Sequence, residues 1–175
     1  MTVWTVGHST HSLETFAALL DAHDVARVAD IRAVPRSRRH PQFHTVALAR
    51  NLPERGVAYV HLPQLGGWRR AHADSPNGAW QNPSFRGYAD YAMDAAFAAG
   101  LVQLRRLAAE RRTAMMCSEA LWWRCHRRLV ADRLVVAGDT VCHISAAGRA
   151  STHHLTPFAT VASDGQITYP AGAPR

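Results

Sequence analysis

"VWTVGHS", residues 3–9, is a short β-rich run that ends in glycine, histidine and serine. Its valines, tryptophan and threonine favour a strand. Ser12 follows as an N-cap candidate, and the apolar residues after it recur at helical spacing. The next apolar run, "VARVADIR" at 25–32, predicts a second strand. Strand, helix and strand in succession favour an α/β fold with a largely parallel sheet.

The same alternation continues along the rest of the chain. Further strands are predicted at 57–62, 113–117 and 140–145, and helices at about 45–55, 88–99, 101–111 and 124–136. We therefore predict one domain over residues 1–175, a three-layer α/β/α sandwich whose mostly parallel sheet has about five strands. Residues 145–175 are expected to add a C-terminal hairpin or an edge strand.

Two polar segments interrupt this pattern. Residues 33–44, "AVPRSRRHPQFH", contain two prolines and three arginines, and residues 63–87 form a longer stretch rich in glycine, proline and asparagine. A loop of the second length in a compact domain is usually functional or mobile.

The composition is that of a soluble globular protein, with 47% hydrophobic and 19% charged residues. No apolar run is long enough for a membrane span, and the first residues have no signal-peptide pattern, so we expect a cytoplasmic protein without a membrane partner. Three cysteines cannot all pair within one chain, and reduced thiols are expected in that compartment.

The charge is strongly basic. The formal net charge is +7, and all twenty basic residues are arginines. Arginine suits bidentate contact with phosphate or carboxylate, so a small anionic ligand or a nucleic acid is a plausible partner. A solvated basic surface explains the composition equally well, and the oligomeric state stays open.

Polar or reactive residues follow the predicted strands. In parallel sheets, ligands bind beyond the carboxyl ends of the strands, so these residues are expected to converge. The candidates for binding a substrate or anion at this edge are Ser9, Asp30, Arg32, Arg36, Arg38, Gly66, Gly67, Cys125, His126 and Arg127, and the catalytic candidates are His8, Cys117 and Glu119.

Cys117 ends a predicted buried strand and precedes a loop and a helix, an arrangement that can stabilise a thiolate. This layout is similar to that of rhodanese-type sulfurtransferases and cysteine phosphatases. The loop departs from the phosphatase pattern, because Arg124 gives a Cys-x6-Arg spacing instead of Cys-x5-Arg. Cys117 is therefore either a nucleophile or a small buried residue that packs well.

Arg124, His126, Arg127 and Arg128 are predicted to open a helix, where the helix dipole disfavours positive charge. A negative partner should offset them. It is either an internal carboxylate, Glu119 or Asp30, or a bound anion.

A metal site is a weaker alternative. Cys117, Cys125, His126, Cys142 and His143 are soft donors, but their spacing lacks the Cys-x2-Cys step of structural zinc sites. The pair Cys117 and Glu119 is similar to part of the zinc deaminase pattern, whose later cysteine motif is absent. We therefore predict no cofactor and keep a bound metal only as the weaker alternative.

Two further groups carry open alternatives. Glu119 and His8 suit general acid/base chemistry, but each is equally suited to a structural hydrogen bond or ion pair. The tryptophans could stack on nucleic-acid bases or anchor the core and loops; they are Trp68, Trp80, Trp122 and Trp123.

Five motifs occur together in a fixed order: "TVGHST", "VADIRAVPRSRRHPQF", "VAYVHLPQLGGWR", "MMCSEALWWRCHRRLVA" and "VCHIS" followed by "HHLT". In this the chain closely resembles the bacterial domain-of-unknown-function family 488. The resemblance implies an α/β fold and marks a set of signature residues: Gly7, His8, Ser9, Asp30, Arg32, Pro35, Ser37, Gly66, Gly67, Cys117, Glu119, Cys125, His126 and Arg127. It implies no activity.

The sequence thus favours an enzyme that acts on a small anionic or nucleotide-like substrate at the carboxyl edge of the sheet. The alternative is a non-catalytic nucleic-acid-binding module that uses its arginine-rich surface.

Overall fold

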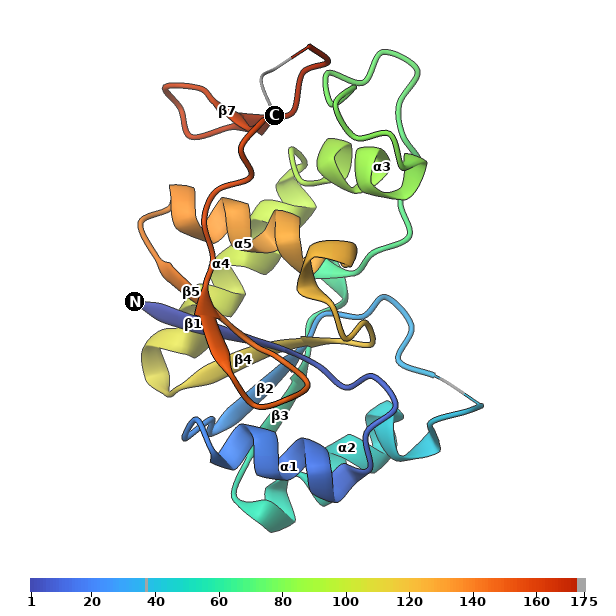
Figure 1. The fold of residues 1–175 in the computed structure, drawn as a ribbon, viewed down its shortest axis with the longest axis vertical. Coiled ribbons are helices and arrows are strands. Elements are labelled where there is room, and N and C mark those ends of the chain that lie inside the picture. Colours follow the sequence, from blue (N-terminus) through green and yellow to red (C-terminus); the bar gives the residue numbers. More distant parts are fainter. Residues whose placement is uncertain (37, 173–175) are drawn as a thin grey trace.

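The computed structural model describes residues 1–36 and 38–172, which form a six-stranded sheet with helices on both faces (Figure 1). The strands of this sheet are β1 (Thr2–Gly7), β2 (Arg27–Asp30), β3 (Ala58–His61), β4 (Thr113–Cys117), β5 (Thr140–Ile144) and β6 (Ala150–Thr152). Their order is β3-β2-β4-β1-β5-β6. The first five strands run parallel, and β6 pairs antiparallel with β5. The predicted α/β fold with a mostly parallel sheet is confirmed.

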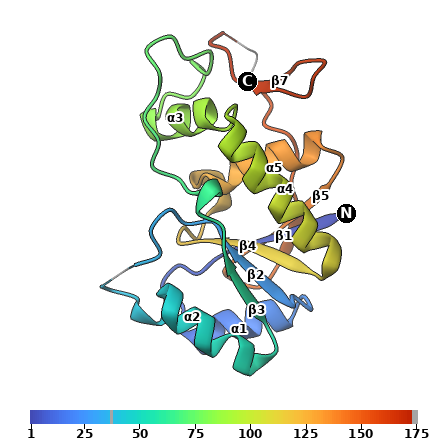
Figure 2. The same ribbon diagram turned by 180° about the vertical axis from the view of Figure 1, so that it is seen from behind.

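The helices are α1 (Leu13–Asp21), α2 (Thr45–Asn51), α3 (Pro83–Tyr91), α4 (Ala95–Glu110) and α5 (Arg127–Val136). Helices α1 and α2 cover one face of the sheet, and α4 and α5 cover the other (Figures 1 and 2). Because strand side chains alternate between faces, Met116 packs in one apolar cluster with Phe16, and Met115 packs in the other with Leu104. The sheet therefore separates two cores.

The predicted helix over 45–55 is divided at Pro53. Helix α2 ends at Asn51, and a 3-10 turn, η2 (Pro53–Arg55), follows it. Gly56 then ends the segment in the left-handed conformation, with φ of 77°, as expected for a glycine that closes a helix. A similar short turn, η1 (Pro41–Phe43), precedes α2.

The two helices predicted at 88–99 and 101–111 were placed wrongly. Helix α4 runs continuously through Gly100, and α3 begins at Pro83, inside the segment predicted to be a loop, and ends at Tyr91. A Cβ atom on Gly100 would lie 2.9 Å from the Cβ of Gln64, in the 3-10 turn η3 (Pro63–Leu65). Gly100 therefore allows this turn to pack on α4; it does not end a helix.

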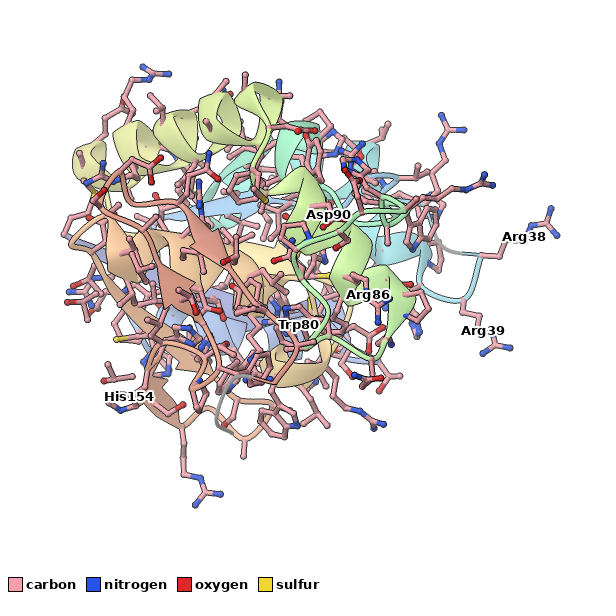
Figure 3. All side chains as sticks on the ribbon, turned by 90° about the horizontal axis from the view of Figure 1, so that it is seen from above. Arg38, Arg39, Trp80, Arg86, Asp90 and His154 are labelled. Carbon is pink, nitrogen blue, oxygen red and sulfur yellow. The ribbon has the colours of Figure 1, made fainter. Side chains whose placement is uncertain are left out.

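The irregular segment that precedes α3 is held by a buried aspartate of that helix, Asp90 (Figure 3). Its carboxylate accepts hydrogen bonds from Ser75 Oγ at 2.6 Å, from Asn77 Nδ2 at 2.7 Å and from the backbone N–H of His72 at 2.8 Å. The loop is thus fixed by polar contacts at one carboxylate.

The helix predicted to begin near residue 124 begins later. A 3-10 turn, η4 (Trp122–Arg124), comes first, His126 is the N-cap, and α5 starts at Arg127. Arg124 is therefore outside the helix, and only Arg127 and Arg128 lie in its first turn.

The C-terminal segment forms both predicted additions. Strand β6 becomes an edge strand, and β7 (Thr160–Val161) pairs with β8 (Ile167–Thr168) as a separate hairpin. Tyr169 then returns to the loop before α3, where its backbone pairs with Asn77 and Ala79. Across the described residues, no helix has the length and apolarity that a bilayer crossing requires.

Candidate functional site

An open cavity of about 310 Å³ lies beyond the carboxyl ends of β2 and β4. Several predicted site residues line it together: Arg32, Gly67, Cys117, Glu119, Cys125 and His126. The others are His8, Ser9, Asp30, Arg36, Arg38, Gly66 and Arg127, which lie outside its lining. The sheet therefore brings distant segments to one place, as parallel strands do at their carboxyl edge.

Cys117, Cys125 and His126 form the thiol cluster of this cavity. The Nδ1 atom of His126 lies 3.7 Å from Cys117 Sγ and 3.6 Å from Cys125 Sγ. The other ring nitrogen, Nε2, lies 3.0 Å from the carbonyl oxygen of Ile31 and donates to it. This bond fixes the ring, so that one imidazole nitrogen faces two buried sulfurs.

Arg127 lies fully buried behind the thiol cluster. Its backbone N–H and its Nε–H both donate to Cys125 Sγ at 3.5 Å, and Nη2 donates to the carbonyl oxygen of Glu119. The remaining nitrogen, Nη1, has no hydrogen-bond partner within the described residues. A guanidinium in a low-dielectric interior is costly unless negative charge lies beside it.

Neither predicted internal partner supplies that negative charge. Glu119 contacts Arg127 through its backbone carbonyl, and its carboxylate is exposed. Asp30 is engaged elsewhere, in an ion pair with Arg32. Among the salt bridges of residues 1–36 and 38–172, none involves Arg127.

The electrostatics place one negative charge on the thiol cluster. A hydrogen bond from Cys125, together with the positive charges of His126 and Arg127, outweighs burial and holds the pKa of Cys117 well below its usual value. Burial and the neighbouring sulfur raise the pKa of Cys125. Burial alone would lower the pKa of His126, but the charge and hydrogen bond of Cys117 raise it on balance. Both shifts favour a Cys117 thiolate next to a protonated His126 imidazole.

The loop after Cys117 is fixed by residues at the end of β1. A Cβ atom on Gly7 would lie 1.9 Å from the carbonyl oxygen of Glu119, so only glycine fits there. The backbone N–H groups of His8 and Ser9 donate to the carbonyl oxygens of Cys117 and Ser118, both at 3.0 Å. The glycine of the "GHS" segment thus lets the cysteine loop approach β1.

His8 is held as a neutral hydrogen-bonded ring. Its Nδ1 donates to the carbonyl of Ser9 at 2.9 Å, and its Nε2 accepts from Arg32 Nη1 at 3.2 Å. Burial, and then the charge of Arg32, lower its pKa to about 4. Arg32 in turn forms a two-point pair with Asp30, at 2.8 and 2.6 Å. His8 and Asp30 therefore orient Arg32 at the cavity wall.

The two glycines of the "LGG" segment have different surroundings. A Cβ on Gly66 would lie 2.7 Å from the Cα of Ala33, so this glycine permits two backbones to touch. Gly67 lies over His126, where a Cβ would come within 3.2 Å of Nδ1. Gly66 is therefore a packing position, and Gly67 keeps the imidazole accessible from the cavity.

The cavity rim contains residues that were not among the predicted site residues. Trp68 is 84% exposed and has a positive φ of 64°, and Arg124 is also exposed. The ring of Tyr88 packs edge-on against His126, with 5.0 Å between centroids. A tyrosine in an amphipathic helix carries no sequence signal for such a role. For Trp68, whose backbone is strained, the only sequence signal is that it directly follows Gly66 and Gly67.

The predicted arginines of the 33–44 segment lie away from the cavity. Arg36 and Arg38 are exposed, and Figure 3 shows Arg38 and Arg39 pointing outward into solvent. Ser37 lies outside the described residues. None of these three arginines lines the cavity.

His143, at another strand end, belongs to a second buried cluster, which we term the histidine relay: Thr5, His143, His153, Asp132 and Tyr169. Thr5 Oγ1 lies 2.8 Å from His143 Nδ1, and His143 Nε2 lies 3.0 Å from His153 Nδ1. Asp132 accepts from His153 Nε2 and from the Tyr169 hydroxyl, both at 2.8 Å. Burial, then His153 and Arg127, lower the pKa of His143 to about 3. The relay is separate from the cavity lining.

The thiol cluster also has a metal-binding geometry. Its three donor atoms lie within 4.8 Å of one another, and Cys142 lies apart in β5. Tetrahedral zinc with one sulfur and one nitrogen ligand requires about 3.6 Å between those two atoms. The three residues therefore fit a soft divalent ion as well as they fit a hydrogen-bonded thiol pair.

The comparisons with known proteins now decide the family. Residues 12–134, more than half of the chain, match the family model described as domain of unknown function DUF488. The protein belongs to the DUF488 family. No curated protein and no solved structure matches it. The DUF488 description carries no activity.

Proposed function

We propose that this DUF488 protein is a thiol-dependent enzyme that acts on a small anionic substrate, with Cys117 as its nucleophile. The observation that carries the proposal is Arg127, a fully buried cation that contacts the cysteine pair and forms no salt bridge within the described part of the chain. A thiolate in the cluster supplies the negative charge that the guanidinium requires.

The cluster has the parts that nucleophilic thiol catalysis requires. Cys117 lines the cavity, and His126 Nδ1 lies within reach of its sulfur to accept the proton. The Ile31 carbonyl holds the imidazole in place, as the third member of such catalytic groups does. The thiolate thus forms at a position that substrate can reach.

The cavity wall favours a substrate with negative charge. Arg32 and Arg124 both line it, and the charge of Arg32 is offset by Asp30, whereas Arg124 forms no salt bridge with a described carboxylate. The exposed carboxylate of Glu119 lines the same cavity and is placed to exchange protons with a leaving group. A volume of about 310 Å³ suits a small molecule.

Alkylation with iodoacetamide across a pH series tests the proposal. We expect Cys117 to be modified first, with a rate midpoint well below that of an ordinary thiol, because its pKa is lowered. His126→Gln should raise that midpoint, since it removes the protonated partner. Cys142→Ala, which changes the cysteine outside the cluster, should leave it unchanged. Modification of Cys117 with an ordinary midpoint, or no faster than Cys142, would contradict the proposal.

A second candidate, nucleic-acid binding, is supported by the exposed rings of Trp68 and Trp123 and by the outward-pointing Arg38 and Arg39. This function predicts binding of a single-stranded oligonucleotide that weakens steeply with salt, because phosphate contacts release counterions. Trp68→Ala should weaken that binding, while the buried Trp80→Phe serves as the control. Absence of binding at low ionic strength would eliminate this candidate.

A further inference from the structure

Two cysteine thiols of the cavity lie next to the same imidazole nitrogen. His126 Nδ1 lies 3.7 Å from Cys117 Sγ and 3.6 Å from Cys125 Sγ, and the two sulfurs are within 4.8 Å of each other. A nucleophilic cysteine that transfers an acyl or alkyl group needs one thiol and one base. A second thiol on the same base requires a different explanation.

Cys125 rests as a thiol beside the Cys117 thiolate, but Arg127 contacts its sulfur directly. The backbone N–H and the Nε–H of Arg127 both donate to its sulfur at 3.5 Å. Hydrogen bonds from a cation stabilise a developing thiolate. Both cysteines line the cavity, but only the sulfur of Cys125 also accepts hydrogen bonds from Arg127. The two thiols therefore have different surroundings within one site.

We infer that the substrate of this site is a small anionic disulfide, and that Cys125 is the resolving thiol that completes its reduction. This inference rests on the proposed function, because it takes Cys117 as the nucleophile. It adds the class of substrate and a role for the second cysteine.

The reaction proceeds in two exchange steps. The Cys117 thiolate attacks one sulfur of the substrate, a mixed disulfide forms, and the other half of the substrate leaves as a thiolate. His126 gives its Nδ1 proton to that departing sulfur, which leaves the imidazole neutral. Cys125 then gives its proton to the neutral His126 and attacks the Cys117 sulfur, which releases the second half as a thiolate. The two enzyme thiols are oxidised to a disulfide, and the substrate disulfide is reduced by two electrons. An external thiol reductant returns the enzyme to the dithiol.

The second step requires the two sulfurs to approach from at most 4.8 Å to about 2.0 Å. Cys125 lies between the short turn η4 and helix α5, on a connection of seven residues from Cys117. Closure therefore needs movement only of the short segment that joins the end of β4 to the start of α5.

Dithiobisnitrobenzoate is a suitable probe, because it is an anionic disulfide with aromatic rings that suit the Trp68 rim. All variants carry Cys142→Ser, which removes the only cysteine outside the cluster. With one equivalent of probe, the cluster-intact protein should release two thionitrobenzoate anions and carry no adduct. Its mass should fall by two hydrogens, and dithiothreitol should restore it.

The matched variant Cys125→Ser should release one thionitrobenzoate and retain the other on Cys117, with a melting temperature close to that of its parent. Rapid reaction in both proteins with the adduct retained in both would overturn the resolving role and leave the proposed function standing. No reaction of Cys117 in the Cys125→Ser variant, at a melting temperature that shows it folded, would overturn the proposed function. Elemental analysis that finds one zinc per chain, with reaction only after chelation, would overturn the disulfide inference.

Discussion

The thiol cluster and the histidine relay are both buried polar groups on the α5 side of the sheet, but they differ in how completely they are paired. In the relay, a single direction of donation satisfies each ring: Thr5 donates to His143, His143 to His153, and His153 to Asp132. Beside the thiol cluster, one guanidinium nitrogen of Arg127 has no hydrogen-bond partner among residues 1–36 and 38–172, and the sulfurs face a cavity. Every ring nitrogen of the relay is therefore paired, whereas the cluster still has groups that a ligand can contact.

This difference separates a structural group from a reactive one. A buried polar network contributes to a unique fold when every member is satisfied, whereas a group left incomplete is free to bind or react. Trp122 connects the two. Its ring stacks on His143 with centroids 4.0 Å apart, and its turn, η4, carries Arg124 toward the cavity and leads into Cys125.

The largest expected effect comes from breaking the relay at its acceptor. Asp132→Ala leaves His153, Tyr169 and the backbone N–H of Thr156 without their shared partner. We expect a loss of about 3–5 kcal/mol in the free energy of unfolding, measured by denaturant titration. The control Asp21→Ala removes an exposed carboxylate at the end of α1 and should change the free energy of unfolding by under about 1 kcal/mol. A loss for Asp132→Ala no larger than the control's would mean that the relay is not structural.

Acid should destabilise the protein through its two neutral buried histidines. The folded pKa values, about 4 for His8 and about 3 for His143, lie below the usual 6.5, so the unfolded chain binds protons first. Above pH 6.5 both histidines are neutral in the folded and the unfolded chain, and the free energy of unfolding has its full value. As the pH falls toward the folded pKa values, each histidine lowers the free energy of unfolding by on the order of a few kcal/mol.

Denaturant titrations between pH 7 and pH 4 measure this loss. His143→Asn should flatten the dependence of the unfolding free energy on pH, and the exposed control His154→Asn should leave it as in the parent protein. An unchanged slope for His143→Asn would show that the relay histidine is not held neutral.

The smallest expected effect tests the link between the two clusters. Trp122→Leu removes the stacked contact with His143 and should cost about 1 kcal/mol of unfolding free energy. It should also slow alkylation of Cys117, because the turn that precedes Cys125 and His126 loses its anchor. Its neighbour Trp123, which is 48% exposed, provides the matched control Trp123→Leu. Equal alkylation rates in the two variants would mean that the clusters are independent.

Local sequence patterns predicted much of the architecture. The five parallel strands, the closing role of Gly56 and the position of Cys117 at a strand end all depend on nearest neighbours and on side-chain periodicity. The helix boundary predicted at Gly100 was wrong because a distant contact, which no local pattern records, decides the role of this glycine. A glycine that stops a helix and a glycine that lets another segment pack on it are identical in sequence, and only the distant contact with Gln64 distinguishes them.

The sequence by itself therefore determined the α/β alternation, the family, and which polar residues follow the parallel strands. The tertiary structure decided their pairing. In the fold, Asp30 pairs with Arg32, and the carbonyl of Glu119 accepts a hydrogen bond from Arg127. Cys125 contacts the same imidazole as Cys117. The physical reason is the distance along the chain over which each feature is decided. Periodicity depends on neighbouring residues, whereas the partner of a buried charge depends on which distant backbones can come into contact, as those of Gly7 and Glu119 do.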